Sequence, residues 1–200
     1  MAGLHASAEV LAFHAACLAI ADWSKTSPAR HASGIWQVVE LNHRFNCLLW
    51  DEEDLARRTR VSDAAIAANK RAIDGYNQKR NDAIERIDET LLETLAGVER
   101  KTGARLNSET AGSLTDRLSI LSLKIHHMRL QTKRADVDQA HIDDCNARLS
   151  RFLEQRRDLA GCLDRLLTEA ARGEAWFRVY RQFKMYNDPR LNPAIYGEKP

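Results

Sequence analysis

The side chains best suited to chemistry lie between Lys70 and Asp88, in the stretch KRAIDGYNQKRNDAIERID. Read as one helix at about 100° per residue, this stretch has one purely polar sector, roughly 80° wide, beside an apolar sector of core-facing width. The polar sector contains Lys70, Asp74, Asn77, Asn81, Glu85 and Asp88. An amphipathic helix needs only two faces, so this third face predicts either a ligand site or a polar seam whose members satisfy one another.

A second polar line runs along the preceding helix, which we expect from Gly34 to about Arg58. Its members are spaced by three or four residues and are Asn42, Asn46, Trp50, Glu53 and Arg57. Ser62 and Asp63 offer an N-cap for the next helix, and so short a connection requires antiparallel neighbours. In that hairpin Asn46 falls opposite Asn77, and Asn42 opposite Asn81. The two polar lines are therefore predicted to face each other.

If the two lines form a site, each charged residue has an expected role. Lys70 and Arg57 would hold a phosphate. Asp74 or Glu53 would act as a base or, together with Asp54, as ligands of a hard cation such as Mg²⁺ or Mn²⁺. The ligand-binding set is completed by side chains suited to sugar hydroxyls or rings: Asn42, Asn46, Trp50, Asn77 and Asn81. The alternative interpretation is a structural seam that fixes the helix register.

In addition to the two polar lines, three further residues are candidate site residues. His43 is a possible general base, although a lone histidine on a helix is more often a surface or satisfied core residue. Arg117 and Lys124, one heptad apart, could form a second anion clamp or a pair of solvated charges.

A metal-dependent pyrophosphohydrolase is an alternative enzyme class, because all-α members of that class bind Mg²⁺ through paired carboxylates on adjacent helices. The chain contains Glu52, Glu53 and a Glu85-Arg-Ile-Asp88 pair. In the predicted hairpin the second pair lies about 45 Å of helix away from Glu53, at 1.5 Å per residue. Only a different register or a partner chain would bring these carboxylates together.

Composition predicts an all-α fold, with 44% hydrophobic residues, 9 Gly and 4 Pro. The formal charge of +2 gives no strong field to gather nucleic acid. The four cysteines are far apart, and we interpret them as reduced core residues.

The longest apolar run, around Val10 to Ala21, is too short to span a bilayer, and no basic region precedes it. We therefore expect a cytoplasmic protein with no membrane span.

We expect a single domain, an elongated bundle of about five long helices with the central hairpin described above. Residues 1–33 would form a first helix, over 4–23, and a loop. Residues 34–173 would form the bundle, in which the helix from Asp63 continues to about Lys101 or Leu106, with Gly103 as terminator, and a further helix starts near Ser113 or Thr115. The last bundle helix ends at Gly173.

The last bundle helix has a heptad-like seam suited to packing against another helix. Its two rows are Ile142, Leu149, Arg156 and Leu163, and Cys145, Phe152, Leu159 and Leu166. Residues 174–200 would form a docking segment, with Trp176 to Tyr186 as a short helix or turn. The tail beyond it carries Leu191, Ile195 and Tyr196 and is expected to dock on the bundle.

Four blocks of the chain resemble a bacterial family of about this length that is known only as a domain of unknown function: NHRFNCLLWDEEDLAR, KRAIDGYNQKRNDAIERID, NSETAGSLTDRLSILSLKIHHM and YRQFKMYNDPRLNP. Members tend to be encoded among glycosyltransferase genes for lipopolysaccharide or exopolysaccharide. The resemblance implies a role in surface-glycan assembly but supplies no reaction. It includes the polar lines found by periodicity, together with Arg80, Asp116 and Arg117.

Besides the metal-dependent pyrophosphohydrolase, the sequence therefore supports two other hypotheses about function. In the first, the protein binds, and could act on, a phosphorylated or nucleotide-linked sugar at the polar lines. In the second, it is a non-enzymatic scaffold that pairs with itself or with a glycosyltransferase through the seam of its last long helix.

Overall fold

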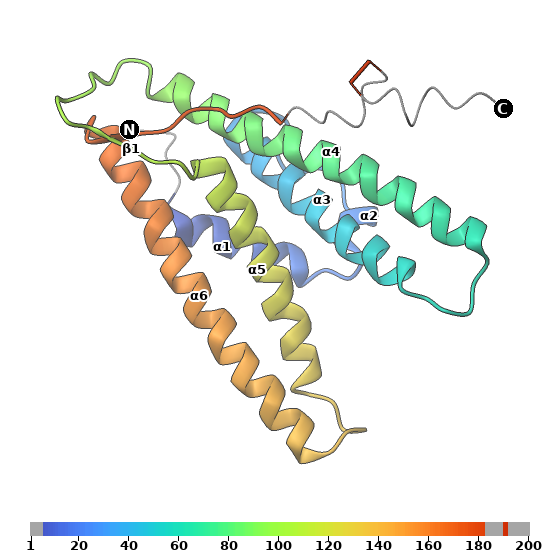
Figure 1. Cartoon of the computed structure of the whole chain (residues 1–200). Coiled ribbons are helices and arrows are strands. Elements are labelled where there is room, and N and C mark those ends of the chain that lie inside the picture. The colour runs from blue at the N-terminus through green and yellow to red at the C-terminus, as the bar shows by residue number, and fades with distance from the viewer. Residues whose placement is uncertain (1–5, 183–189, 192–200) are drawn as a thin grey trace.

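The computed structural model describes residues 6–182, 190 and 191 (Figure 1). These residues form six α-helices and two very short strands. The elements are α1 (Ser7–Leu18), α2 (Trp23–Thr26), α3 (Gly34–Ala56), α4 (Asp63–Thr94), β1 (Arg105–Leu106), α5 (Ala111–Gln131), α6 (Gln139–Ala171) and β2 (Ala175–Trp176). The predicted all-α class is confirmed.

The predicted antiparallel hairpin is formed by α3 and α4. The hydroxyl of Ser62 caps α4 by accepting a hydrogen bond from the backbone N–H of Ala65, at 3.3 Å. Farther along the hairpin, Asn69 Nδ2 donates to Glu52 Oε2 at 2.7 Å. The Phe45 and Tyr76 rings stack with their centroids 6.4 Å apart. These contacts agree with the register expected from the short connection.

A second hairpin consists of α5 and α6, and it diverges from the first (Figure 1). Thr110 and Asp138 cap the two helices through side-chain oxygens that accept from backbone N–H groups. The heptad-like seam of α6 packs within the chain, against α5 and α1. Its members Cys145, Leu159 and Leu163 are buried. Part of this seam is therefore covered within the chain, whereas Ile142, Leu149, Phe152 and Arg156 are half-buried.

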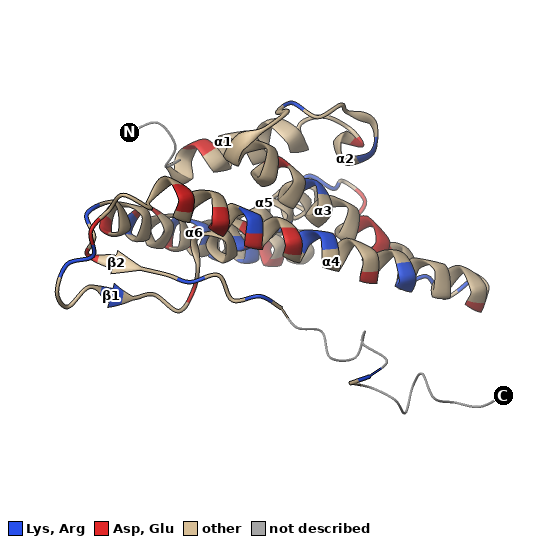
Figure 2. Ribbon diagram, turned by 90° about the horizontal axis from the view of Figure 1, so that it is seen from above, with Lys and Arg blue, Asp and Glu red and all other residues tan. Residues whose placement is uncertain are grey.

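The main core lies where the hairpins meet and α1 crosses them. Val10, Val38, Ile87, Leu118 and Leu163 come from five different helices and belong to one buried cluster. In Figure 2, α1 and α2 lie on one side of the hairpins and the two strands on the other, while charges of both signs alternate along α4. No helix in residues 6–182 combines the length and low charge content of a bilayer-spanning segment.

The helix that begins at Asp63 ends at Thr94, so its predicted extension to Lys101 or Leu106 was wrong. Part of the chain beyond it pairs with a distant segment instead. Lys101 N donates to Gly173 O at 3.0 Å, and β1 lies parallel to β2. Gly103 adopts a positive φ of 81° in the loop before β1 and does not end the helix. Gly173, with φ 70°, does follow the end of α6, as predicted.

Two further boundaries differ from the sequence prediction. The first helix stops at Leu18, and Asp22, in the left-handed region with φ 50°, redirects the chain so that Trp23 is buried. The predicted helix or turn from Trp176 to Tyr186 is not helical as far as residue 182, because Trp176 ends β2 and residues 177–182 have no regular secondary structure. This segment docks on α4, because Arg181 forms ion pairs with Glu85 and Glu89. Residues 183–186 of that prediction lie outside the described residues. Ile195 and Tyr196 lie outside the described residues.

Candidate functional site

A network of buried polar side chains connects α3 and α5. Asp116 Oδ1 accepts hydrogen bonds from the Nδ2 atoms of Asn42 and Asn46, each at 2.8 Å. Asn46 Nδ2 also donates to Ser119 Oγ at 3.0 Å. All four side chains are buried, and a buried carboxylate is costly unless such donors satisfy it. The network therefore fixes one face of α3 against α5.

Two stacked histidines continue this network toward α1. His43 Nδ1 lies 2.8 Å from Ser119 Oγ, within hydrogen-bonding distance, and the tautomer of the ring decides which of the two atoms donates. The rings of His14 and His43 stack with their centroids 4.2 Å apart. Burial lowers the pKa of His43 to about 3 and that of His14 well below its usual value, so both rings are neutral.

Next to the network is a pocket of about 250 Å³, which we call the α3–α4–α5 pocket. Asn46 belongs to both the network and the pocket wall. The pocket is lined by Asn46, Leu49, Trp50, Glu53, Asp54, Arg57, Asn77, Arg80, Ile120 and Leu123. The hairpin brings Asn46 and Asn77 to this pocket, as its register predicted.

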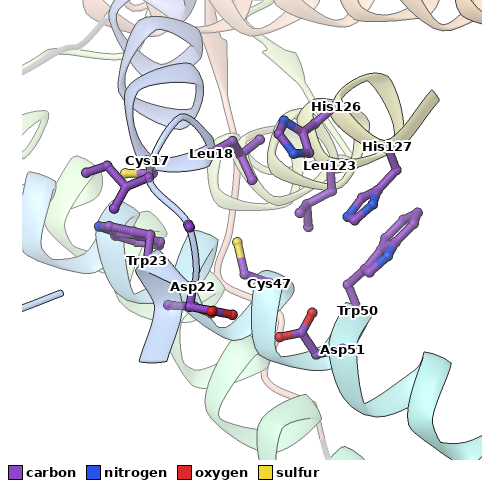
Figure 3. A pocket seen from close by; sticks show the side chains of 13 residues that line it. Cys17, Leu18, Asp22, Trp23, Cys47, Trp50, Asp51, Leu123, His126 and His127 are labelled. Carbon is purple, nitrogen blue, oxygen red and sulfur yellow. The ribbon is translucent and has the colours of Figure 1, made fainter. Parts of the chain in front are cut away.

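Trp50 separates this pocket from a smaller one of about 160 Å³ beside α1 and α2, shown in Figure 3. Its ring stacks on His127, with centroids 4.3 Å apart and an interplanar angle of 5°. Its indole Nε1 is buried and has no hydrogen-bond partner. Trp50 therefore offers an aromatic surface in a fixed orientation, while its unsatisfied donor is enclosed by the protein.

The two arginines of the α3–α4–α5 pocket differ in their pairing. Arg57 is exposed and donates to Asp54 Oδ1 at 2.9 Å and Glu53 Oε2 at 3.4 Å. Arg80 is half-buried, and its Nε atom is buried without a hydrogen-bond partner. Within residues 6–182, no carboxylate forms an ion pair with Arg80. Arg80 is therefore the cation that the pocket leaves for a ligand.

The structure brings together only part of the predicted site. Glu53, Arg57 and Asn77 line the pocket, as do Asn46 and Trp50. Three other members lie elsewhere or are engaged. Lys70 and Asp74 are exposed and pair with each other at 2.5 Å, while Asn81 Nδ2 donates to Gln182 Oε1 at 2.8 Å. Asn42 is buried in the network beside the pocket.

The predicted carboxylate ligands and the predicted base His43 do not lie together in one site. Asp74 is paired on the exposed surface of α4, whereas Glu53 and Asp54 pair with Arg57, so the proposed carboxylate trio is not assembled. Among the described residues, no group of three or more His, Cys, Asp or Glu is arranged to hold a metal ion. His43 is fully buried behind Ser119.

Arg117 and Lys124 line an open groove of about 530 Å³ between α5 and α6. Arg117 pairs with Glu109 at 2.5 Å, and Lys124 Nζ lies 5.9 Å from the centre of the Phe152 ring. Ile120 lines both this groove and the α3–α4–α5 pocket, so the two hollows adjoin.

The Glu85–Asp88 pair of the hydrolase alternative is engaged in structural contacts. Glu85 accepts from Arg181 and from the backbone N–H of Gln182. Asp88 Oδ1 accepts from the backbone N–H of Gly112 at 2.6 Å, at the start of α5. Burial raises the pKa of Asp88 to about 6 despite this hydrogen bond.

The sequence indicated Arg80 and Asp116 only as positions that match the family, without a role for either. Arg80 follows Asn77 by one helical turn, which is the available local signal. The contacts of Asp116 with Asn42 and Asn46 depend on how α5 docks on α3, and helical periodicity contains no information about that docking.

Six α-helices and two very short strands among the described residues place this protein in the all-α class. The family model described as "Protein of unknown function (DUF4254)" matches residues 36–179. The chain therefore belongs to the DUF4254 family, and the resemblance found in its polar blocks is confirmed. No curated protein and no solved structure matches the chain.

Proposed function

We propose that this protein binds a sugar phosphate in the α3–α4–α5 pocket, as a cytoplasmic participant in surface-glycan biosynthesis. The observation that carries the proposal is Arg80, a half-buried residue of the pocket wall whose side chain forms no ion pair with a carboxylate of the described residues and has a buried Nε without a partner. A guanidinium binds a phosphate through a planar fork of N–H groups.

The other polar groups of the pocket suit the sugar portion of such a ligand. Asn77 and Asn46 supply amide groups, Glu53 supplies a carboxylate, and Trp50 supplies an aromatic ring. Pockets that hold drug-sized ligands usually span about 300–1,000 Å³. A volume of about 250 Å³ therefore suits a monosaccharide phosphate better than a whole nucleotide sugar.

The arrangement favours binding over catalysis. Glu53 and Asp54 are held by Arg57, and the nearest histidine of the network, His43, is buried behind Ser119. The scaffold hypothesis is less favoured, because four residues of the α6 seam on which it depended are buried within the chain: Cys145, Leu159, Leu163 and Leu166. The gene neighbourhood implied by the family resemblance supports a role in glycan assembly.

The test is a thermal-shift and calorimetric titration with hexose 1-phosphates, hexose 6-phosphates and nucleotide sugars. At a hundred times its dissociation constant, a ligand adds about 2.7 kcal/mol to the free energy of unfolding. We expect a sugar phosphate to stabilise the wild type and Arg80→Gln to weaken its binding about ten- to hundredfold, because a charge-assisted hydrogen bond is lost.

The matched control is Arg71→Gln, which removes the same charge from an exposed position of α4 outside the pocket. It should bind like the wild type. Trp50 fluorescence provides a second readout, assigned by comparison with Trp50→Phe. A wild type that responds to no sugar phosphate, or equal affinities for the Arg80→Gln and Arg71→Gln variants, would contradict the proposal.

A further inference from the structure

A second pocket with unpaired positive charge lies on the other side of α5, between α1, α5 and α6. We call it the α1–α5–α6 pocket, and its volume is about 170 Å³. One wall consists of small and apolar residues of α1. The opposite wall carries Arg129 and His126 from α5 and Arg156 from α6. None of these residues lines the α3–α4–α5 pocket.

Arg156 occupies an unusual place in the sequence pattern. It falls in the heptad-like series of α6, between Leu149 and Leu163, where an apolar residue would continue the packing seam. The structure leaves it half-buried, while Leu163 is only 2% exposed. A charged side chain in a packing row costs stability unless its charge is compensated.

No such compensation is present among the described residues. The side chains of Arg129 and Arg156 form no hydrogen bond or ion pair with any residue in 6–182, 190 or 191. Burial lowers the pKa of Arg156, and the nearby positive charge of Arg129 lowers it further. Burial also lowers the pKa of His126, and the charge of Arg129 again adds to this effect.

We propose that the α1–α5–α6 pocket binds a phosphate-type dianion between Arg129 and Arg156. Two guanidinium groups that converge on one pocket can both donate to a tetrahedral oxyanion, which would replace their repulsion by two attractive contacts. At about 30 Å³ of liquid volume for each water molecule, the pocket has room for a phosphate group but not for a nucleotide. His126 can donate one ring N–H from the same wall.

This site is independent of the sugar-phosphate proposal, because the two pockets share no residue. The experiment is a thermal-shift titration of the whole chain with inorganic phosphate, with sodium chloride at matched ionic strength as reference. At ten times the dissociation constant, phosphate is expected to raise the melting temperature by about 3–6 °C. Arg156→Gln should abolish the shift, and Arg129→Gln should weaken binding about tenfold.

Two controls separate this site from general charge effects and from the first pocket. Arg157→Gln removes an exposed arginine next to Arg156 in sequence and should leave the shift intact. Arg80→Gln, in the α3–α4–α5 pocket, should also leave it intact. In chloride alone, Arg156→Gln is expected to melt no earlier than the wild type, because it removes an uncompensated charge from a packing row.

A third titration with glycerol 3-phosphate identifies the source of the phosphate group. Tighter binding of the ester than of inorganic phosphate indicates a phosphomonoester, and tighter binding of inorganic phosphate indicates the free ion; either supports the site. The proposal is overturned if phosphate shifts the wild type no more than chloride does. It is also overturned if Arg156→Gln and Arg129→Gln respond to phosphate like Arg157→Gln, or if Arg80→Gln alone removes the response.

Discussion

Asp116 holds together the polar interface between α3 and α5. Its Oδ1 atom accepts from both Asn42 and Asn46, and its side chain is only 7% exposed. Asp74, which the sequence places in the centre of a polar face, forms an exposed pair with Lys70. The two aspartates therefore have very different energetic roles, although both stand beside apolar residues on their helices.

We predict that Asp116→Ala lowers the free energy of unfolding by about 2–4 kcal/mol, because it leaves two buried amides without their acceptor. Asp116→Asn keeps an acceptor oxygen and should cost less. Asp74→Ala, as the control, should cost under about 1 kcal/mol, since exposed ion pairs contribute little. Urea unfolding followed by circular dichroism measures all three, and equal losses for the two alanine variants would refute this distinction.

At the scale of elements, the contact between α4 and α5 depends on a glycine. A Cβ atom at Gly112 would lie 2.4 Å from the backbone oxygen of Ile84 and 3.0 Å from Asp88. The backbone N–H of Gly112 donates to Asp88, so the two helices are in direct contact at this point. Asp88, which the sequence suggested as half of a metal-binding pair, instead satisfies the first turn of α5.

We predict that Gly112→Ala destabilises the protein by about 1–3 kcal/mol, because neither the Ile84 carbonyl nor α5 can move without loss of packing. Gly161→Ala is the matched control on α6, where an added Cβ would meet nothing within 4 Å. That variant should gain roughly 0.5–1 kcal/mol from helix propensity. Thermal unfolding of the two variants should shift in opposite directions; a Gly112→Ala variant as stable as the wild type would contradict the close approach.

At the scale of the whole molecule, three buried titratable groups near the helix junction make stability depend on pH in opposite ways. Burial lowers the pKa of both His14 and His43, so their contribution to stability is complete above pH 6.5 and is lost as pH falls. For His43 this loss continues down to about pH 3. The pKa of Asp88 is raised to about 6, so the folded state takes up its proton first. Its contribution is complete below pH 3.8 and is lost as pH rises through 6.

We predict that the loss of stability between pH 7 and pH 5 is smaller in His43→Asn than in the wild type, by about 2 kcal/mol, since one pKa unit corresponds to 1.36 kcal/mol. Asp88→Asn should instead enlarge this loss by about 1 kcal/mol. Urea titrations at the two pH values measure both differences. An identical pH dependence in the wild type and both variants would show that these groups do not titrate with folding.

Much of the architecture follows from local signals. Ser62 caps α4, Gly173 follows α6, and the short connection after α3 sets the register that brings Asn46 and Asn77 to one pocket. Such features depend on residues that are close in sequence or on the geometry of one hairpin. The end of α4 was mispredicted because the chain near Lys101 binds the backbone at Gly173, a contact that no local pattern contains.

The amino-acid sequence by itself determined the helical class, the α3–α4 hairpin and which residues form its polar lines, because helix periodicity and capping are local properties. Only the tertiary structure decided which of those residues share a site. The docking of α5 buries Asn42 and Asn46 against Asp116, and the segment after β2 covers Asn81, while Lys70 and Asp74 remain on the surface. Periodicity shows which side chains share a face of a helix, but the burial and pairing of that face depend on elements that are distant in sequence.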